Sequence, residues 1–131
     1  MRPRPASLLA TLLATSSALL ACGGSSHPLQ SVTVSPATAS GSQVQFTATG
    51  LYSTMPTSAD ITSTTMWCVG STTGLCSADV AAIAEVTAGL AECASGVSGT
   101  VIVLAGQPAN HPGMNQGYQL EPFGAAQLTC P

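Results

Sequence analysis

Apolar residues alternate with polar ones at every second position over much of the chain. In one segment Val32 and Val34 share a face, and in the next Val44, Phe46 and Ala48 share a face opposite Gln and Thr residues. Side chains that alternate with this period point to opposite faces of a β-strand, so each segment has one face to bury and one to expose. The pattern therefore predicts half-buried strands.

Five further runs rich in Val, Ile, Thr and Leu continue this pattern, and glycine and proline separate them. They lie at residues 63–69, 83–86, 90–93, 100–105 and 125–130. About seven short strands with frequent turn signals predict an all-β protein built as an antiparallel β-sandwich. A helix is the alternative for residues 78–94, because Ala and Glu favour helices, but Gly89 interrupts any helical face there.

The first part of the chain forms a separate region. A short basic stretch with Arg2 and Arg4 precedes an apolar run at residues 6–21, which ends at Cys22. This order is typical of a secretory signal peptide. A transmembrane anchor is the alternative, but the run has about 16 residues, with Ser and Thr among them, and a membrane span needs roughly 20 apolar residues.

A lipobox-like sequence, LLAC, ends at Cys22, and the residues GGSS follow it. It resembles the site in bacterial lipoproteins where the cysteine is acylated, with palmitate among the chains, and becomes the mature N-terminus. The resemblance implies a signal peptide at residues 1–21, a flexible spacer at 22–28 and an exported protein. It further implies attachment to the membrane through the acyl chains of Cys22, since each buried CH₂ contributes about 0.8 kcal/mol. Gly23 favours sorting to the outer membrane of the cell envelope.

Charge is scarce and one-sided. The chain has 2 Lys and Arg residues, both within its first four positions, against 5 Asp and Glu residues. A mature chain that starts at Cys22 has no cation to neutralise phosphates, which excludes nucleic-acid binding and phosphate clamps built on Lys or Arg.

Four cysteines remain in the mature chain after Cys22, namely Cys68, Cys76, Cys93 and Cys130. An even number in an exported protein predicts two disulfides. Zinc is the alternative, but its sites need closely spaced ligand pairs, which this chain lacks. Three pairings are possible. We favour Cys68–Cys76, which closes a Gly-containing loop, together with Cys93–Cys130, which ties the last strand to the rest of the domain.

Catalytic groups are few. The histidines are His27, in the spacer, and His111; no Gly-x-Ser-x-Gly nucleophile motif is present, and the acids are isolated among Ser and Thr. Glu85 and Glu92 are expected to face each other across a hairpin as solvated residues, and Trp67 is expected in the core. We expect a non-catalytic protein without a cofactor or an obligatory metal. The alternative is a small secreted hydrolase or carbohydrate-active protein that uses His111 and a nearby acid.

One segment, residues 106–124, concentrates amphipathic and hydrogen-bonding side chains. We expect any ligand to bind there, chiefly through Tyr118, with His111, Asn115 and Gln116 around it. Amides and a tyrosine suit a neutral polar partner such as a glycan or another protein. The alternative is a structural insertion in which Tyr118 and Phe123 pack locally.

Several short sequences occur in the order of a known domain. They are SVTVSP at residues 31–36, QFTATG at 45–50, Trp67, IAEV at 83–86, GL at 89–90 and GTVIV at 99–103. They resemble the successive strands of the group 2 bacterial immunoglobulin-like domain over about residues 29–106, with residues 125–129 as the last strand. Four cysteines and the long 106–124 connection depart from that family.

This resemblance implies an immunoglobulin-like sandwich over residues 29–131 with a long insertion at 106–124. Members of the family mostly serve as spacers, adhesin stalks and surface-display modules. We therefore expect a lipid-anchored envelope module with a structural, adhesive or recognition role. A third possibility is a subunit that docks on a larger envelope assembly through an exposed apolar strand face.

Overall fold

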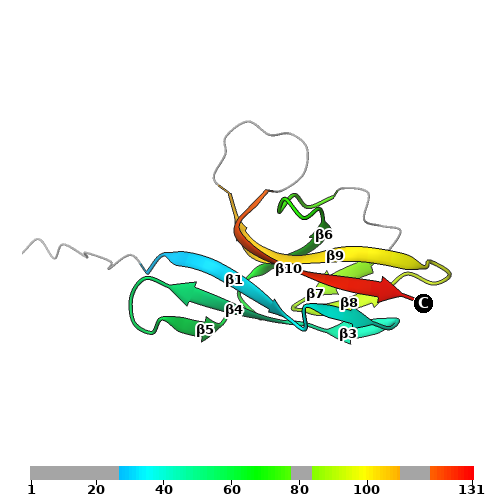
Figure 1. Cartoon of the computed structure of the whole chain (residues 1–131), viewed down its shortest axis with the longest axis horizontal. Helices are drawn as coiled ribbons and strands as arrows, with labels where there is room; N and C mark the ends of the chain where they lie inside the picture. Colours follow the sequence, from blue (N-terminus) through cyan, green and yellow to red (C-terminus); the bar gives the residue numbers. More distant parts are fainter. Residues whose placement is uncertain (1–26, 78–83, 110–118) are drawn as a thin grey trace, which may run out of the picture.

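The computed structural model describes residues 27–77, 84–109 and 119–131, which form ten β-strands and, within these ranges, no helix (Figure 1). The strands are β1 (Leu29–Ser35), β2 (Thr38–Ser40), β3 (Gln43–Gln45), β4 (Thr47–Tyr52), β5 (Ser58–Asp60), β6 (Met66–Gly70), β7 (Ala84–Thr87), β8 (Leu90–Cys93), β9 (Gly99–Pro108) and β10 (Leu120–Cys130). The expected all-β class is confirmed. The helical alternative for residues 78–94 is wrong over β7 and β8, and residues 78–83 lie outside the described ranges.

The strands form two layers. The first layer contains the sheet β1-β4-β5 and the sheet β3-β8-β7, and the second is the four-stranded sheet β2-β10-β9-β6. β3 and β4 belong to one run of chain that is interrupted at Phe46, whose N–H donates to the Gly89 carbonyl at 2.7 Å. All strand pairs are antiparallel except β2 with β10, which is parallel.

The main hydrophobic core, here called the inner core, lies between the layers. Alternation along the strands directs one face of each layer toward it, as the sequence predicts. Its buried members are Val32, Val34, Phe46, Ala48, Ile61, Val69, Ala91, Val101, Val103, Ala105, Ala126, Leu128 and Cys130. Trp67 is half-buried against this core, and its Nε1 donates to the Thr62 carbonyl at 2.8 Å, which satisfies the indole N–H.

Two disulfides join the four cysteines in the favoured pairing. Cys68–Cys76 is local, with Cα atoms 5.7 Å apart, and Cys93–Cys130 connects β8 of the first layer to the end of β10 in the second, with Cα atoms 5.9 Å apart. The zinc alternative is wrong for these residues, because their sulfurs are bonded to each other.

The structure adds strands that the pattern did not predict. β2 is only three residues long, and it pairs with β10 at the far end of the chain; β5 is also three residues long and pairs with β4 through Leu51 and Ser58. Both are rich in Ser and Ala, so their alternation carries little hydrophobic contrast. The described ranges contain no helix with the length and apolar character that a membrane span requires.

Candidate functional site

The expected insertion at residues 106–124 overlaps the last two strands, so its predicted bounds are wrong: residues 106–108 belong to β9, residues 120–124 belong to β10, and only residues 109–119 join the strands. β9 ends at Pro108 and β10 begins at Leu120, and the Ala109 N–H donates to the Gln119 carbonyl at 2.7 Å. The four residues expected to bind, His111, Asn115, Gln116 and Tyr118, lie outside the described residues, as does Cys22. The structure therefore describes the two ends of the segment, here called the stem, namely residues 106–109 and 119–124.

A second hydrophobic cluster, here called the outer cluster, supports the stem on the outward face of the second layer. It contains buried Cys76, Leu104 and Leu120, with partly buried Met66, Cys68, Ile102 and Phe123 around them. Leu104 is opposite Cys68 in the β6–β9 register, so both point away from the inner core. β9 is thus buried on both faces at this point.

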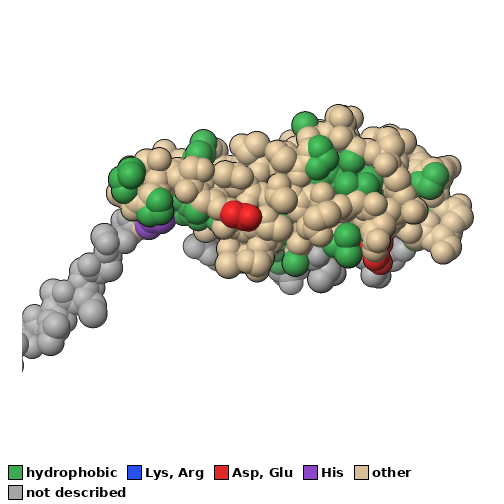
Figure 2. Space-filling view, turned by 90° about the horizontal axis from the view of Figure 1, so that it is seen from below, with side chains coloured by type: hydrophobic (Ala, Val, Ile, Leu, Met, Phe, Trp, Pro, Cys, Tyr) green, Lys and Arg blue, Asp and Glu red, His purple; other side chains and the backbone are tan. Residues whose placement is uncertain are grey.

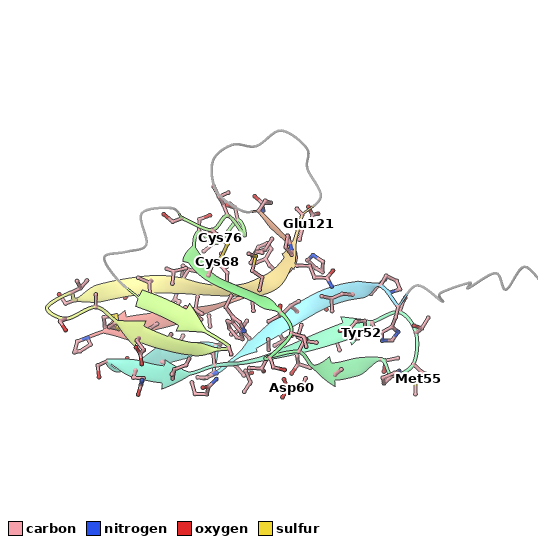
Figure 3. All side chains as sticks on the ribbon, turned by 180° about the vertical axis from the view of Figure 1, so that it is seen from behind. Tyr52, Met55, Asp60, Cys68, Cys76 and Glu121 are labelled. Atoms are coloured by element: carbon pink, nitrogen blue, oxygen red, sulfur yellow. A yellow bond between two sulfur atoms is a disulfide. The ribbon has the colours of Figure 1, made fainter. Side chains whose placement is uncertain are left out.

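The loop at residues 71–77 covers the outer cluster. The Cys68–Cys76 disulfide ties the loop to β6, and Figure 3 places both cysteines on the side of the molecule where Glu121 of the stem lies. Gly74 has a φ of +83°, and a Cβ at this position would come within 2.6 Å of the Phe123 ring. Only glycine fits this turn against the aromatic ring without displacement.

Hydrogen bonds join this loop to the stem. The Leu120 N–H donates to the Gly74 carbonyl at 2.9 Å, and Gln119 Nε2 donates to the Thr73 carbonyl at 2.8 Å. Leu75 also forms an isolated antiparallel bridge with Gln119. The start of β10 is thus held by backbone and side-chain bonds from a disulfide-bonded loop.

Thr73, Gly74 and Gln119 were not predicted as parts of the site. The sequence did predict both the disulfide loop and the 106–124 segment. Their contact depends on the pairing of β6 with β9 and joins Thr73 to Gln119, 46 positions apart in the chain, and no local sequence pattern indicates such a contact.

An open depression of about 570 Å³ lies beside the stem. The described residues that line it are Thr64, Thr65, Met66, Gly106, Gln107 and Pro108. Thr65 Oγ1 donates to the Gly106 carbonyl at 2.9 Å, which fixes one wall. None of these lining residues is charged, so the depression offers amide, hydroxyl and thioether groups to a ligand and suits a neutral polar one.

The acidic side chains that the structure describes, those of Asp60, Glu92 and Glu121, lie on three different strands. Asp60 lies on β5, where the Thr62 hydroxyl and then the Thr62 N–H, at 2.8 Å from Oδ1, hold its pKa below the ordinary value of 3.8. Glu92 accepts a hydrogen bond from Gln43 on the neighbouring strand. Glu85 and Glu92 are directly paired in the β7–β8 register, as predicted.

His27, expected in a flexible spacer, has defined contacts. Its ring stacks on Tyr52 with centroids 4.2 Å apart, and Nδ1 lies 2.5 Å from Thr54 Oγ1. Within the described ranges, no three His, Cys, Asp or Glu side chains gather as a metal site would require.

Large exposed hydrophobic side chains are Leu51, Met55 and Leu75 among the residues that the structure describes. Leu51 belongs to β4, Met55 to the turn after β4, and Leu75 to the 71–77 loop. These three side chains do not share one strand face. A subunit that docks through a sheet surface is expected to have its exposed apolar side chains together on one such face.

The chain was compared with known protein families and with curated proteins. No family model and no curated protein matches it.

Proposed function

We propose that the protein is a non-catalytic, lipid-anchored module of a bacterial cell envelope, with an immunoglobulin-like sandwich that has a structural, adhesive or recognition role. Its ligand-binding element is the 106–124 segment together with the stem depression. Its partner is a neutral polar surface, such as a glycan or another protein.

The observation that carries this proposal is the strand order. With β3 and β4 counted as one interrupted strand, and with the three-residue strands β2 and β5 left aside, the first layer has the order β1, β3/β4, β8, β7 and the second has β6, β9, β10. In the constant-type immunoglobulin arrangement the sheets have the order ABED and CFG, so every main strand has a counterpart here. The half-buried Trp67 on β6 agrees with the tryptophan of strand C in that fold.

Two features support an envelope location. The lipobox-like sequence ends at Cys22 where the apolar run stops, and disulfides form and persist mainly in oxidising compartments. The Cys93–Cys130 disulfide ties the two layers of a small domain, a common way to stabilise exported proteins with small cores.

The stem supports a recognition role. The stem, which is the two ends of the 106–124 segment, is held by the outer cluster, the Cys68–Cys76 disulfide and the hydrogen bonds to Gly74 and Thr73. Binding residues are commonly carried on long loops that a rigid scaffold positions.

The test combines fractionation with site-specific crosslinking. The full chain is expressed in a Gram-negative bacterium, and a photoreactive amino acid replaces exposed Gln107 of the stem or, as the control, exposed Ser98 between β8 and β9. We expect a crosslinked envelope partner from position 107 that is absent from position 98. Tyr118→Ala should then lower the crosslinking yield without changing the amount of protein.

Two results would contradict the proposal. Equal crosslinking from positions 107 and 98 would remove the recognition role of the stem. Unchanged membrane attachment and processing of Cys22→Ser would remove the lipid anchor.

A further inference from the structure

We propose that the turn between β4 and β5, residues 52–57 and here called the β4–β5 turn, rests on the surface of the lipid bilayer. The acyl chains of Cys22 would enter the same bilayer, so the inference depends on the proposed lipid anchor. The module would then have a fixed orientation on the membrane.

The first argument is the docking of His27. Its ring stacks on Tyr52, and its Nδ1 hydrogen-bonds with Thr54, so the chain is held to the β4–β5 turn at that residue. In Figure 3, Tyr52 and Met55 lie together at one end of the molecule, the end where β1 begins in Figure 1. The tether therefore meets the sandwich at this turn.

The second argument is the length of the tether. Five residue steps separate Cys22 from His27. A fully extended chain spans at most about 3.6 Å per residue, so this tether reaches at most about 18 Å. That distance is less than the thickness of a bilayer, and it keeps the β4–β5 turn close to the headgroups whenever Cys22 is acylated.

The third argument is the chemistry of the turn. Met55 is 82% exposed and Leu51 is 44% exposed, the two most exposed large hydrophobic side chains that the structure describes. An apolar side chain gains free energy when a lipid interface removes it from water, and tyrosine is enriched at such interfaces. Met55 is therefore well suited to the headgroup region, and half-buried Tyr52 lies beside it at the same end of the molecule.

The fourth argument is charge. No Asp, Glu, Lys or Arg occurs between residues 23 and 59, so the chain from the tether to β5 is neutral apart from His27. In Figure 2 the histidine lies at this end with some of the hydrophobic side chains, other hydrophobic side chains lie over the opposite half of the face, and the nearest visible acidic side chain lies toward the middle of the molecule. Anionic headgroups would neither repel nor attract such a surface, so contact should not depend on lipid charge.

The experiment places a tryptophan on the turn of the acylated protein. The chain has one native tryptophan, Trp67, which is half-buried beside the inner core. Met55→Trp adds a second, and Ser98→Trp, at an exposed position between β8 and β9, is the matched control. Each acylated protein is reconstituted in vesicles of zwitterionic phosphatidylcholine with bromine on the acyl chains, which quenches only tryptophans that contact lipid.

We expect at least twofold quenching of the added emission in Met55→Trp and none in Ser98→Trp or wild type. The quenching should persist when a fifth of the lipid is anionic. Acylated Met55→Trp that is quenched no more than Ser98→Trp would overturn this inference alone. A mass spectrum without acyl chains on Cys22 would overturn the lipid anchor and this inference together, so the two failures can be told apart.

A second measurement uses the wild-type protein and avoids any folding defect. Hydrogen peroxide oxidises exposed methionine to its sulfoxide, with the peroxide as the oxidant, which is reduced to water. We expect oxidation of Met55 to be about tenfold slower on vesicles than in the protein without residues 1–22, which has neither the apolar run nor acyl chains, with half-buried Met66 as the internal reference. Equal oxidation rates for Met55 in the two samples would contradict the inference.

Discussion

The inner core and the outer cluster share strand β9 but depend on different contacts. β9 contributes Val101, Val103 and Ala105 to the inner core and Leu104 to the outer cluster. The inner core has thirteen buried residues from both layers, whereas the outer cluster has three and is covered by one loop. We therefore expect the inner core to be the main support of the fold, and the outer cluster to depend on the Cys68–Cys76 disulfide and Gly74.

Because the two clusters depend on different contacts, we expect that the stability of the sandwich and the geometry of the candidate site can be changed separately. The stem of the candidate site rests on the outer cluster, so damage to that cluster should change the site more than it changes the sandwich. Damage to the inner core should weaken both regions together, because a small domain unfolds cooperatively.

The largest effect is expected from Phe46→Ala. Phe46 is fully buried in the inner core at the interruption between β3 and β4, and its removal leaves a cavity. Phe-to-Ala changes of this kind cost about 3–5 kcal/mol in the free energy of unfolding. Urea unfolding followed by circular dichroism measures the loss. A loss below about 1 kcal/mol would mean that the inner core is not the main support of the fold.

The next effect compares the two disulfides. Loop-closure entropy predicts a loss of roughly 4 kcal/mol for Cys93→Ala with Cys130→Ala, and roughly 2.5 kcal/mol for Cys68→Ala with Cys76→Ala. The local pair should nevertheless have the larger effect on the stem. Hydrogen exchange of the Leu120 amide, which donates to the Gly74 carbonyl, is the readout.

We expect the Leu120 amide to exchange faster than the loss in the global free energy of unfolding explains, and only when the Cys68–Cys76 disulfide is absent. If both double variants change its exchange only in proportion to their global stability, then the outer cluster is not an independent unit.

A smaller effect is expected from Gly74→Ala. The new methyl group meets the Phe123 ring at 2.6 Å and the Leu120 carbonyl oxygen at 2.9 Å, at a φ of +83°. Gly96→Ala is the matched control, because Gly96 has a φ of +77° and open space around it. Backbone strain alone costs about 1 kcal/mol, and overpacking adds about 1–3 kcal/mol. In thermal unfolding, Gly74→Ala should lose more stability than Gly96→Ala, and the difference should equal the overpacking cost. Equal losses of stability would mean that the Phe123 ring moves away from the new methyl group without cost.

The smallest effect concerns Asp60, which lies outside both clusters. The Thr62 hydroxyl and N–H lower its folded pKa below 3.8, so the ionised carboxylate stabilises the fold at higher pH. This contribution is lost as the pH falls through the folded pKa. The stability difference between wild type and Asp60→Asn should therefore shrink when urea unfolding is repeated at pH 3 instead of pH 6. A difference that is the same at both values would contradict the role of Thr62.

The inner core could be predicted from the sequence, and the outer cluster could not. Val32, Val34, Phe46 and Ala48 alternate with polar residues, so their strands and buried faces follow from local pattern alone. Leu104 lies in the run VIVLA, where apolar residues on both faces indicate a strand covered on both sides. The sequence does not say what covers the outward face, because the 71–77 loop must fold back across β6 to do so.

Two further features could not be predicted from the sequence pattern, because both depend on contacts between residues far apart in the chain. β2 gains its partner only through parallel pairing with β10, about 90 residues away in the chain. His27 lies in a spacer whose composition indicates flexibility, yet its ring stacks on Tyr52, a contact that depends on the tertiary fold. The disulfide pairing could be predicted from the sequence because Cys68 and Cys76 close a short loop, and once they are paired Cys93 can only pair with Cys130.

The Cys93–Cys130 disulfide has a mechanical consequence for a chain that is pulled from both ends. Tension applied at Pro131 reaches Cys130 and passes through the sulfur bridge directly to β8, so the 37 residue steps between the two cysteines carry none of it. At about 3.6 Å per residue, roughly 130 Å of chain is withheld from extension. Strands β9 and β10, which include most of the stem, lie in a closed ring whose backbone carries none of this tension, and force reaches them only through their pairing with β6 and β2.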